Sequence, residues 1–546
     1  MATAAQSEGP RVFLRKASGL IRTASGLDVF VFNIGLISVG LGVGTIMLYG
    51  PAFYPGGDVL GATIFAAVVM LFCVWGFVTW TVAIPRSGGS YVFASRIWPP
   101  SVAFTLSFTE CLVLIFYGAV AAYWVVLIGI SPMLSIAGAI SGSEGLTNAS
   151  VTVIQPLPMF LIGSGLLIVA GALLASGMRH YLLSQKVVFT IAMLGSLLVI
   201  ILLAAGSRET FIANLNTLFA STMGVDDVYA ATISSAKENG WGYENGNLST
   251  SIKLANFAFL PFVGAFLSIF IGGEIKAAAK AQTLGMVGAL VAAVAVWAVT
   301  IVLALNVFGY DFIGAAAYNF LGIYVFGFLE SGVTTPIDPS INGLTGVLTN
   351  STAVAWLVSI GFIAWIWMWI PAALTCGIRG MVAWSLDRLA PEAFAVVSPK
   401  RHTPTVSIGI ATALGVIFMA CLAFTTYAST IVLLFEATVL AWCVTLIGGV
   451  FFPYRRRDLF ERSPLATKNI FGLPMMSVAC GLGFIGMAFL LYNLIVDPVA
   501  AGHDPIQLGI VGAVILAGLV FYLTMKAIRR AQGIDITAAF REIPVE

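Results

Sequence analysis

Two acidic side chains lie deep inside long apolar segments of this chain, and they are the residues best suited to proton chemistry. Glu110 stands about ten residues into one apolar run, and Glu436 stands about seven residues into another. Apolar surroundings disfavour the charged form of a carboxyl group, which lets such an acid take up and release a proton. The alternative role is structural, since a protonated acid also hydrogen-bonds to a neighbouring helix and holds two helices together.

Glycine residues interrupt two other apolar segments. Gly40, Gly42 and Gly44 fall in the first segment, residues 27–54, and Gly264 falls in the second. In a membrane each unpaired backbone group costs several kcal/mol, so broken backbone persists only where it lines a cavity or is buried in protein. A matched pair of breaks indicates a binding site near the middle of the membrane, although glycine also serves close helix packing.

Broken helices expose backbone groups that suit a zwitterion. Free N–H groups at the start of a helix half favour a carboxylate, and free carbonyls at the end of another half favour an ammonium group or a sodium ion. The predicted substrate-binding residues are Ser38, Gly40, Gly42, Gly44, Thr45, Phe262, Gly264 and Phe266. The candidates for ion coupling are Glu110 and Glu436, which would carry a proton, and Ser359, which would contact sodium.

The composition identifies an integral membrane protein. Hydrophobic residues make up 59% of the 546 residues, charged residues make up 9%, and the mean hydropathy is +1.00. A soluble domain carries about 25% charged residues. The six cysteines lie in apolar segments and the three histidines are scattered, so neither disulfides nor a metal site is predicted. No catalytic residues and no cofactor are predicted either. The loops contain no cluster of His, Cys or Asp of the kind that a membrane-embedded enzyme needs.

Twelve apolar runs are long enough to span a membrane, which takes roughly 20 residues each. The predicted spans lie near residues 27–54, 58–84, 101–128, 155–176, 183–205, 252–273, 282–309, 352–376, 405–426, 429–453, 472–495 and 506–528. A further apolar stretch, 312–328, is predicted to form an external helix that does not span.

The basic residues orient these spans. With the N-terminus in the cytoplasm, 23 of the 26 lysines and arginines fall on the cytoplasmic side, and Arg208, Lys237 and Lys253 fall outside. The positive-inside rule therefore favours cytoplasmic N- and C-termini and rejects a thirteenth span. The net charge of +2 reflects topology and gives no reason to expect a nucleic acid partner.

The spans divide into two sets of five and a final pair. An odd number of helices per set inverts the second set, which is the pattern of an inverted repeat whose first helix is broken. The predicted organisation is a cytoplasmic segment 1–26, a first repeat 27–205, an extracellular loop 206–251, a second repeat 252–453 with an extracellular loop 310–350, a cytoplasmic loop 454–471, helices 11 and 12 at 472–528, and a cytoplasmic tail 529–546.

Three motifs resemble a known family. They are PRSGGSYVFASR at residues 85–96, FLPFVGAFLSIFIGGEIK at 259–276, and RGMVAWSLDRLAPEAFAVVSPKRHTP at 379–404. In order and spacing they are similar to motifs of the amino acid–polyamine–organocation (APC) permeases. This resemblance implies an all-α leucine-transporter fold and secondary transport of amino acids or related amines. Phe266 departs from the pattern, because many members carry an acid there. The lysine that proton-coupled members often carry within helix 5 is absent, since residues 191–193 are apolar and Lys186 lies close to the cytoplasmic end.

We therefore expect a permease of the plasma membrane that works by alternating access, with proton-coupled symport as the first hypothesis. The alternatives are a sodium-coupled or exchange-type permease of the same fold, and a transporter-like nutrient sensor. Charged residues near the cytoplasmic helix ends either form an inner gate or are ordinary interfacial charges. The pairs considered are Glu274 with Lys276, Asp387 with Arg388, and Arg22 with Asp28.

Overall fold

The structure is a computed structural model that describes residues 21–242, 248–325, 327–333, 339–425, 433–497, 505–534, 536 and 540. In this part of the chain twelve helical segments are long and apolar enough to cross a membrane. The strands described are limited to one hairpin, β1 (Asn469–Ile470) with β2 (Leu473–Pro474). The predicted all-α membrane architecture with twelve spans is confirmed.

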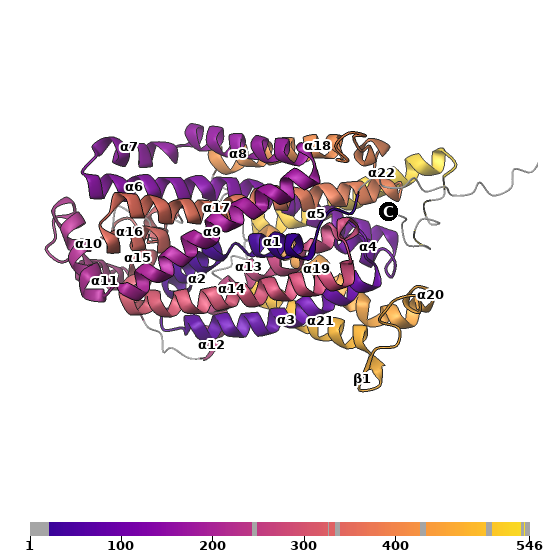
Figure 1. The fold of residues 1–546 in the computed structure, drawn as a ribbon, viewed down its shortest axis with the longest axis horizontal. Helices are drawn as coiled ribbons and strands as arrows, with labels where there is room; N and C mark the ends of the chain where they lie inside the picture. Colours follow the sequence, from indigo (N-terminus) through magenta and orange to yellow (C-terminus); the bar gives the residue numbers. More distant parts are fainter. Residues whose placement is uncertain are drawn as a thin grey trace, which may run out of the picture.

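The membrane-spanning elements run along the long axis of the molecule (Figure 1). In chain order they are α1 (Gly26–Ile37) with α2 (Val39–Phe53); α3 (Val59–Ala83); α5 (Pro100–Trp124), the π-helical η1 (Val125–Ile130) and α6 (Ser131–Ser141); α8 (Pro156–Ser176); α9 (Met178–Ala205); α12 (Leu248–Leu254), α13 (Asn256–Phe262) and the 3₁₀ helix η2 (Val263–Phe270); α14 (Ala278–Phe308); α17 (Thr352–Leu386); α18 (Thr405–Phe424); α19 (Leu433–Arg455); α21 (Met475–Val496); and α22 (Pro505–Ala531).

Shorter helices gather at the two ends of the bundle. One end, on the left of Figure 1, carries α10 (Arg208–Met223), α11 (Val228–Glu238), α15 (Tyr310–Phe320) and α16 (Ile341–Thr349), and we call it the capped end. The opposite end carries α4 (Ser90–Ala94), η3 (Gly272–Glu274), η5 (Glu392–Ala395), α20 (Arg457–Phe460) and the β1–β2 hairpin, and we call it the basic end. Helix α7 (Glu144–Val153) follows α6.

The two predicted loops at the capped end contain several helices. Residues 206–251 were expected to be an exposed loop, but α10 and α11 form there. Within 310–350 the expected helix at 312–328 appears as α15 followed by the π-helical η4 (Leu321–Val325), and α16 is an addition. The stretch 312–328 is not among the candidate spans of the described residues.

The first span breaks at Ser38, and not at the glycines that follow it. Ser38 has φ 51° and ψ 76°, a left-handed conformation that separates α1 from α2. Gly40, Gly42 and Gly44 are all within the continuous helix α2, so their predicted place in non-helical backbone is wrong. At Gly42 the role of the glycine is close packing, because a methyl group there would overlap the indole of Trp297.

The sixth span breaks close to the predicted position. The α-helical backbone ends at Phe262, and a 3₁₀ helix begins at Val263 and includes Gly264. Pro261 lacks an N–H, so it cannot donate the bond that an uninterrupted α-helix needs at this point. The α-helix therefore ends close to the predicted position, but Gly264 lies in a 3₁₀ helix, so its predicted place in non-helical backbone is wrong.

Candidate functional site

A small cavity of about 30 Å³ lies beside the break in the first span. It adjoins the start of α2 and is enclosed by α9, α14, α16 and α17. This volume is enough for a water molecule or two and too small for an amino acid, so the structure represents a closed state of the cavity. The lining residues are Val39, Gly40, Val43, Gly195, Ser196, Val199, Val296, Thr300, Ile341, Asn342, Val358, Phe362 and Trp365.

The start of α2 adjoins this cavity and has backbone N–H donors that its own helix does not use. The first backbone bond of α2 runs from the N–H of Gly42 to the carbonyl oxygen of Ser38, at 2.7 Å. The N–H groups before Gly42 therefore have no partner within their own helix, and the Ser38 side chain caps none of them. Since Val39 and Gly40 line the cavity, it receives both free donors and the positive end of the helix dipole.

Three buried polar side chains near the cavity have no hydrogen-bond partner among the described residues. They are Asn342, which lines the cavity, and Ser38 and Ser359, each of which is next in sequence to a lining valine. All three are 2% exposed or less. Unsatisfied buried polar groups are costly, and their concentration around one cavity indicates a place where a polar ligand binds.

Most of the predicted substrate-binding residues pack around the break without lining the cavity. Of the eight, only Gly40 contributes to the lining. A methyl group at Gly44 would meet only Phe362 at ordinary contact distance, 3.6 Å. The hydroxyl of Thr45 donates back to the carbonyl of Leu41 at 2.7 Å, so it is engaged within its own helix.

The aromatic residues of the sixth span belong to the packed core. The Phe262 ring stacks on Trp297 with centroids 4.5 Å apart, and the Phe266 ring stacks on Phe77 at 4.2 Å. Both phenylalanines are completely buried. Neither lines the cavity in this state, so the structure offers packing as the role of these two side chains.

Gly264 allows two broken spans to touch. A methyl group there would overlap the backbone of Leu36 and Ile37, the last residues of α1 before the left-handed Ser38. Only a glycine permits backbone atoms to approach so closely. The glycine that makes room for the break in the first span is therefore Gly264, which lies in the sixth span.

Glu110 lies at a junction of three segments. Its carboxylate accepts a hydrogen bond from the hydroxyl of Ser90 in α4 and another from the indole of Trp442 in α19, the latter at 2.6 Å. Glu110 is fully buried, and both of these partners donate, which suits an ionised carboxylate. Trp442 also contacts the Phe266 ring edge to face at 5.0 Å, so the broken sixth span and Glu110 share one neighbour.

Glu436 is a second buried acid. It lies on α19, is 5% exposed, and its Oε1 has no hydrogen-bond partner among the described residues. The Tyr117 ring on α5 packs against neighbouring Phe435 at 5.9 Å. Glu110 and Glu436 therefore both lie where α5 meets α19, and neither is part of the cavity lining.

At the basic end, the acids expected near helix ends form ion pairs, but with other bases than those considered. Arg379 on α17 makes a two-pronged contact with Glu274, at 2.6 Å from Nε and 3.1 Å from Nη2. Lys186 on α9 lies 2.8 Å from Asp28 on α1. Lys276 and Arg22, the sequence neighbours, are not the partners in these pairs.

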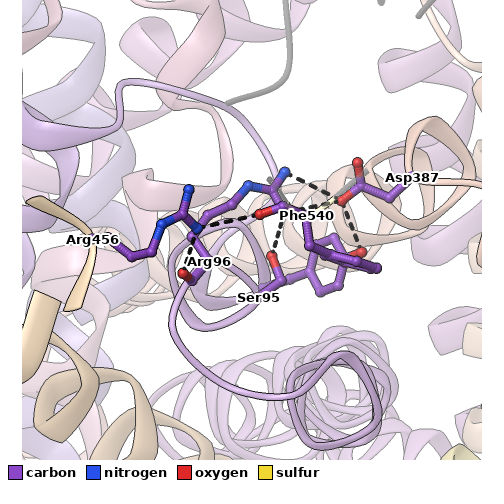
Figure 2. Close-up of polar contacts among 6 residues, drawn as sticks. Ser95, Arg96, Asp387, Arg456 and Phe540 are labelled. Carbon is purple, nitrogen blue, oxygen red and sulfur yellow. Dashed lines mark hydrogen bonds and ion pairs between the residues drawn. The ribbon is translucent and has the colours of Figure 1, made fainter. Parts of the chain in front are cut away.

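The third pair is between Arg96 and Asp387, at 3.3 Å, with both side chains almost fully buried. Figure 2 shows how further groups converge on it: Ser95 accepts from the guanidinium of Arg96, and the ring of Phe540 lies 5.7 Å from it. Arg456 donates to the carbonyls of Arg96 and Phe540. A residue of the C-terminal tail thus covers a buried charge of the 85–96 motif.

The glycines of that motif are explained by their backbone. Gly88 has φ +119° and Gly89 has φ +64°, conformations that side chains rarely adopt. The N–H of Gly88 donates to the carbonyl of Phe270 at 3.1 Å, and a methyl group on Gly89 would overlap the Phe270 ring. The motif is therefore held directly against the end of the broken sixth span.

Sequence reasoning missed most of the cavity. Ser196, Thr300 and Asn342 are polar residues within otherwise apolar stretches, a signal that was available but is common in membrane helices. Asn342 also lies in a region that was assigned to an external loop. Among the described residues no group of three or more His, Cys, Asp or Glu side chains is arranged to hold a metal ion.

Comparison with known proteins was made on the whole chain. A family model described as amino acid permease matches residues 25–521, which include all three motifs and both broken spans. No curated protein matches the chain.

Proposed function

Since the chain belongs to the amino acid permease family, and is thus a multi-pass transporter of amino acids or related amines, we propose that it works by alternating access with proton coupling. The observation that carries this proposal is the cavity at the start of α2, where backbone donors and unpartnered polar groups meet next to both breaks. A substrate carboxylate bound there replaces its lost water with N–H donors and a helix dipole.

The closed basic end supports alternating access. The Glu274–Arg379 and Asp28–Lys186 pairs join the broken spans to α17 and α9, and they must separate before the cavity can open on that side. We assign the basic end to the cytoplasm of a plasma-membrane protein, because lysine and arginine favour that side. The inverted repeat of a leucine-transporter fold then gives two related halves that exchange which end is open.

For coupling we favour Glu110. It shares Trp442 with the broken sixth span, so a change in its protonation alters a contact next to the break. A protonated carboxyl would accept less well from two donors, which links proton binding to rearrangement. Glu436 is the second proton candidate because one of its oxygens has no partner among the described residues.

Sodium coupling is the alternative that a separate observation favours. The hydroxyls of Ser38 and Ser359 are buried without partners among the described residues, and hydroxyl and carbonyl oxygens are the ligands that sodium takes. In this case the two glutamates have structural roles only.

Uptake into proteoliposomes with separately imposed pH and sodium gradients tests these proposals. Glu110→Gln mimics the protonated acid, so we expect exchange of substrate to persist while accumulation driven by a pH gradient falls at least tenfold. Glu461→Gln, an exposed acid at the basic end, is the matched control and should behave as the wild type.

The outcomes separate the alternatives. If both Glu110→Gln and Glu436→Gln still accumulate substrate under a pH gradient, neither acid is the coupling site. Dependence of uptake on sodium at fixed pH would then support the role of Ser359. Absence of uptake and exchange for every amino acid and amine tested would contradict the transport proposal and leave binding without transport, as in a nutrient sensor.

A further inference from the structure

Helix α16 enters the bundle although it belongs to the segment between two spans. Every residue from Ile341 to Leu348 is buried. Its far end is held by Asn214 of α10, whose amide donates to the carbonyls of Val347 and Leu348 at 3.3 and 2.9 Å. A methyl group at Gly346 would overlap Ile136 of α6, so α16 is also packed tightly from the side. This helix is therefore a fixed wall of the cavity rather than a loose loop.

Asn342 is the residue of α16 that meets the cavity with unused polar groups. It is 2% exposed, and both its Oδ1 and its Nδ2 lack partners among the described residues. The next polar residue on the same helix, Thr345, is equally buried but donates to the carbonyl of Ile341 at 2.6 Å. Among the polar residues within α16, Asn342 is therefore the one that lines the cavity and lacks a partner in the described residues.

The other polar lining side chains are already engaged. Ser196 accepts a hydrogen bond from the indole of Trp365 at 2.8 Å, and Thr300 donates to the carbonyl of Val296 at 2.8 Å. The lining contains no lysine, arginine, aspartate or glutamate. With the carboxylate of a substrate at the start of α2, its ammonium group needs an oxygen acceptor, and among the lining side chains Oδ1 of Asn342 is the oxygen without a partner in the described residues.

We propose that Asn342 is a substrate-contacting residue that accepts a hydrogen bond from the α-ammonium group of the substrate, and that the site takes neutral amino acids. The inference rests on the proposed function. Eight of the thirteen lining residues are valine, isoleucine, phenylalanine or tryptophan, and their side chains provide an apolar surface for the substrate side chain. A charged substrate side chain would be left unpaired against them, which excludes cationic and acidic amino acids.

The experiment compares each amino acid with its deamino analogue, the carboxylic acid in which hydrogen replaces the amino group. Binding to the purified full-length protein is measured by competition and by ligand-induced thermal stabilisation across the proteinogenic amino acids. The variant Asn342→Leu keeps the side-chain volume and removes the acceptor. A hydrogen bond to a charged group is worth about 1.5–3 kcal/mol, so its loss should weaken amino acid binding roughly tenfold to a hundredfold.

The decisive readout is the ratio of the two affinities. In the wild type the amino acid should bind far more tightly than the deamino analogue. In Asn342→Leu this preference should shrink by about tenfold or more, because only the amino acid loses a contact. A second variant, Asn342→Asp, adds a negative charge to the cavity. It should allow lysine, arginine or their decarboxylated amines to bind, because their cationic side chains would then have a partner.

Asn214→Ala is the matched control. It removes the bonds that hold the far end of α16 without changing a group in the cavity, so it should lower affinity for both ligands alike, if at all. The inference is overturned if Asn342→Leu weakens both ligands by the same factor, if Asn342→Asp keeps the wild-type ligand profile, or if the wild type prefers charged amino acids. If the wild type binds no amino acid, the result contradicts the proposed function itself, and the inference that rests on it with it.

Discussion

The two ends of the bundle are closed by different physical means. At the basic end, ion pairs connect the broken spans and the 85–96 motif to the surrounding helices. At the capped end, the contacts around α15 and α16 include ring stacking, as between Tyr229 and Phe312 at 4.7 Å, and hydrogen bonds from neutral groups such as Asn214. The cavity with unused polar groups lies against this second kind of closure.

The difference indicates which barrier is harder to open. Separating a buried ion pair leaves two charges that need water or a new partner, whereas separating stacked rings exposes mainly apolar surface. Opening at the basic end therefore requires water or a new partner that compensates the separated charges. Substrate binding at the break shifts the equilibrium between the closed and open conformations only by the difference in its affinity for them. Separating the stacked rings of the capped end needs no compensation of this kind.

Breaking the strongest pair should have the largest effect. Arg379→Met leaves Glu274 buried without its guanidinium, and removing one partner of a buried pair costs about 3–5 kcal/mol. We expect a marked fall in melting temperature, measured in detergent by the loss of a monodisperse chromatographic peak. The double variant Arg379→Met with Glu274→Gln removes both charges and should recover most of the loss.

Native Cys376 reports whether this change opens the basic end. It is fully buried one turn before Arg379 on α17. In the wild type it should resist alkylation by a water-soluble maleimide, and in the double variant it should react, as followed by mass spectrometry of the peptide. A single variant as stable as the wild type, or a double variant that keeps Cys376 protected, would mean that this pair is not the barrier.

The next effect concerns the point where the two breaks meet. Gly264→Ala places a methyl group against the backbone of Leu36 and Ile37, which cannot move aside as a side chain can. Overpacking of this kind costs about 1–3 kcal/mol. We expect lower stability, and uptake reduced more than stability alone explains, because the methyl group forces the spans apart at the cavity.

Gly409→Ala on α18 is the control, since a methyl group there meets nothing within 4 Å. Alanine is favoured over glycine in a helix by up to about 1 kcal/mol, so this variant should be neutral or slightly more stable. Equal melting temperatures and equal uptake for the two variants would show that the close approach at Gly264 is dispensable.

These regions also differ in how much of them could be predicted from sequence. The spans followed from hydropathy alone, because the bilayer sets their length and composition. The end of the α-helix in the sixth span was located near Gly264, because Pro261 and Gly264 fall within one apolar segment. The break at Ser38 was missed, since a serine carries no signal for a left-handed backbone and the glycine that makes room for it is on another span.

Pairing was less predictable than position. The acids at Glu274 and Asp387 were recognised, yet their bases lie 105 and 291 residues away in the sequence, and only the fold brings them together. Asn342 was not among the predicted site residues either. Its importance comes from having no partner among the described residues, and sequence cannot show whether a polar side chain is satisfied.

The smallest effect is expected at the C-terminal tail, where Phe540 covers the Arg96 guanidinium (Figure 2). A cation–π contact is worth about 0.5–2 kcal/mol, less than a buried ion pair. We expect the membrane helices to stay folded when this contact is lost, so the loss is limited to the free energy of docking Phe540. Phe540→Ala should therefore leave the melting temperature nearly unchanged and speed up proteolytic removal of a C-terminal epitope tag.

Phe471→Ala, which changes a phenylalanine that is 97% exposed at the same end, should alter neither quantity. If Phe540→Ala instead lowers the melting temperature as far as Arg379→Met does, the tail is part of the cooperative unit that closes the basic end. The difference in the free energy of opening the two ends would then exceed what the ion pairs alone contribute. Opening the basic end would also require Phe540 to leave Arg96 and Arg456.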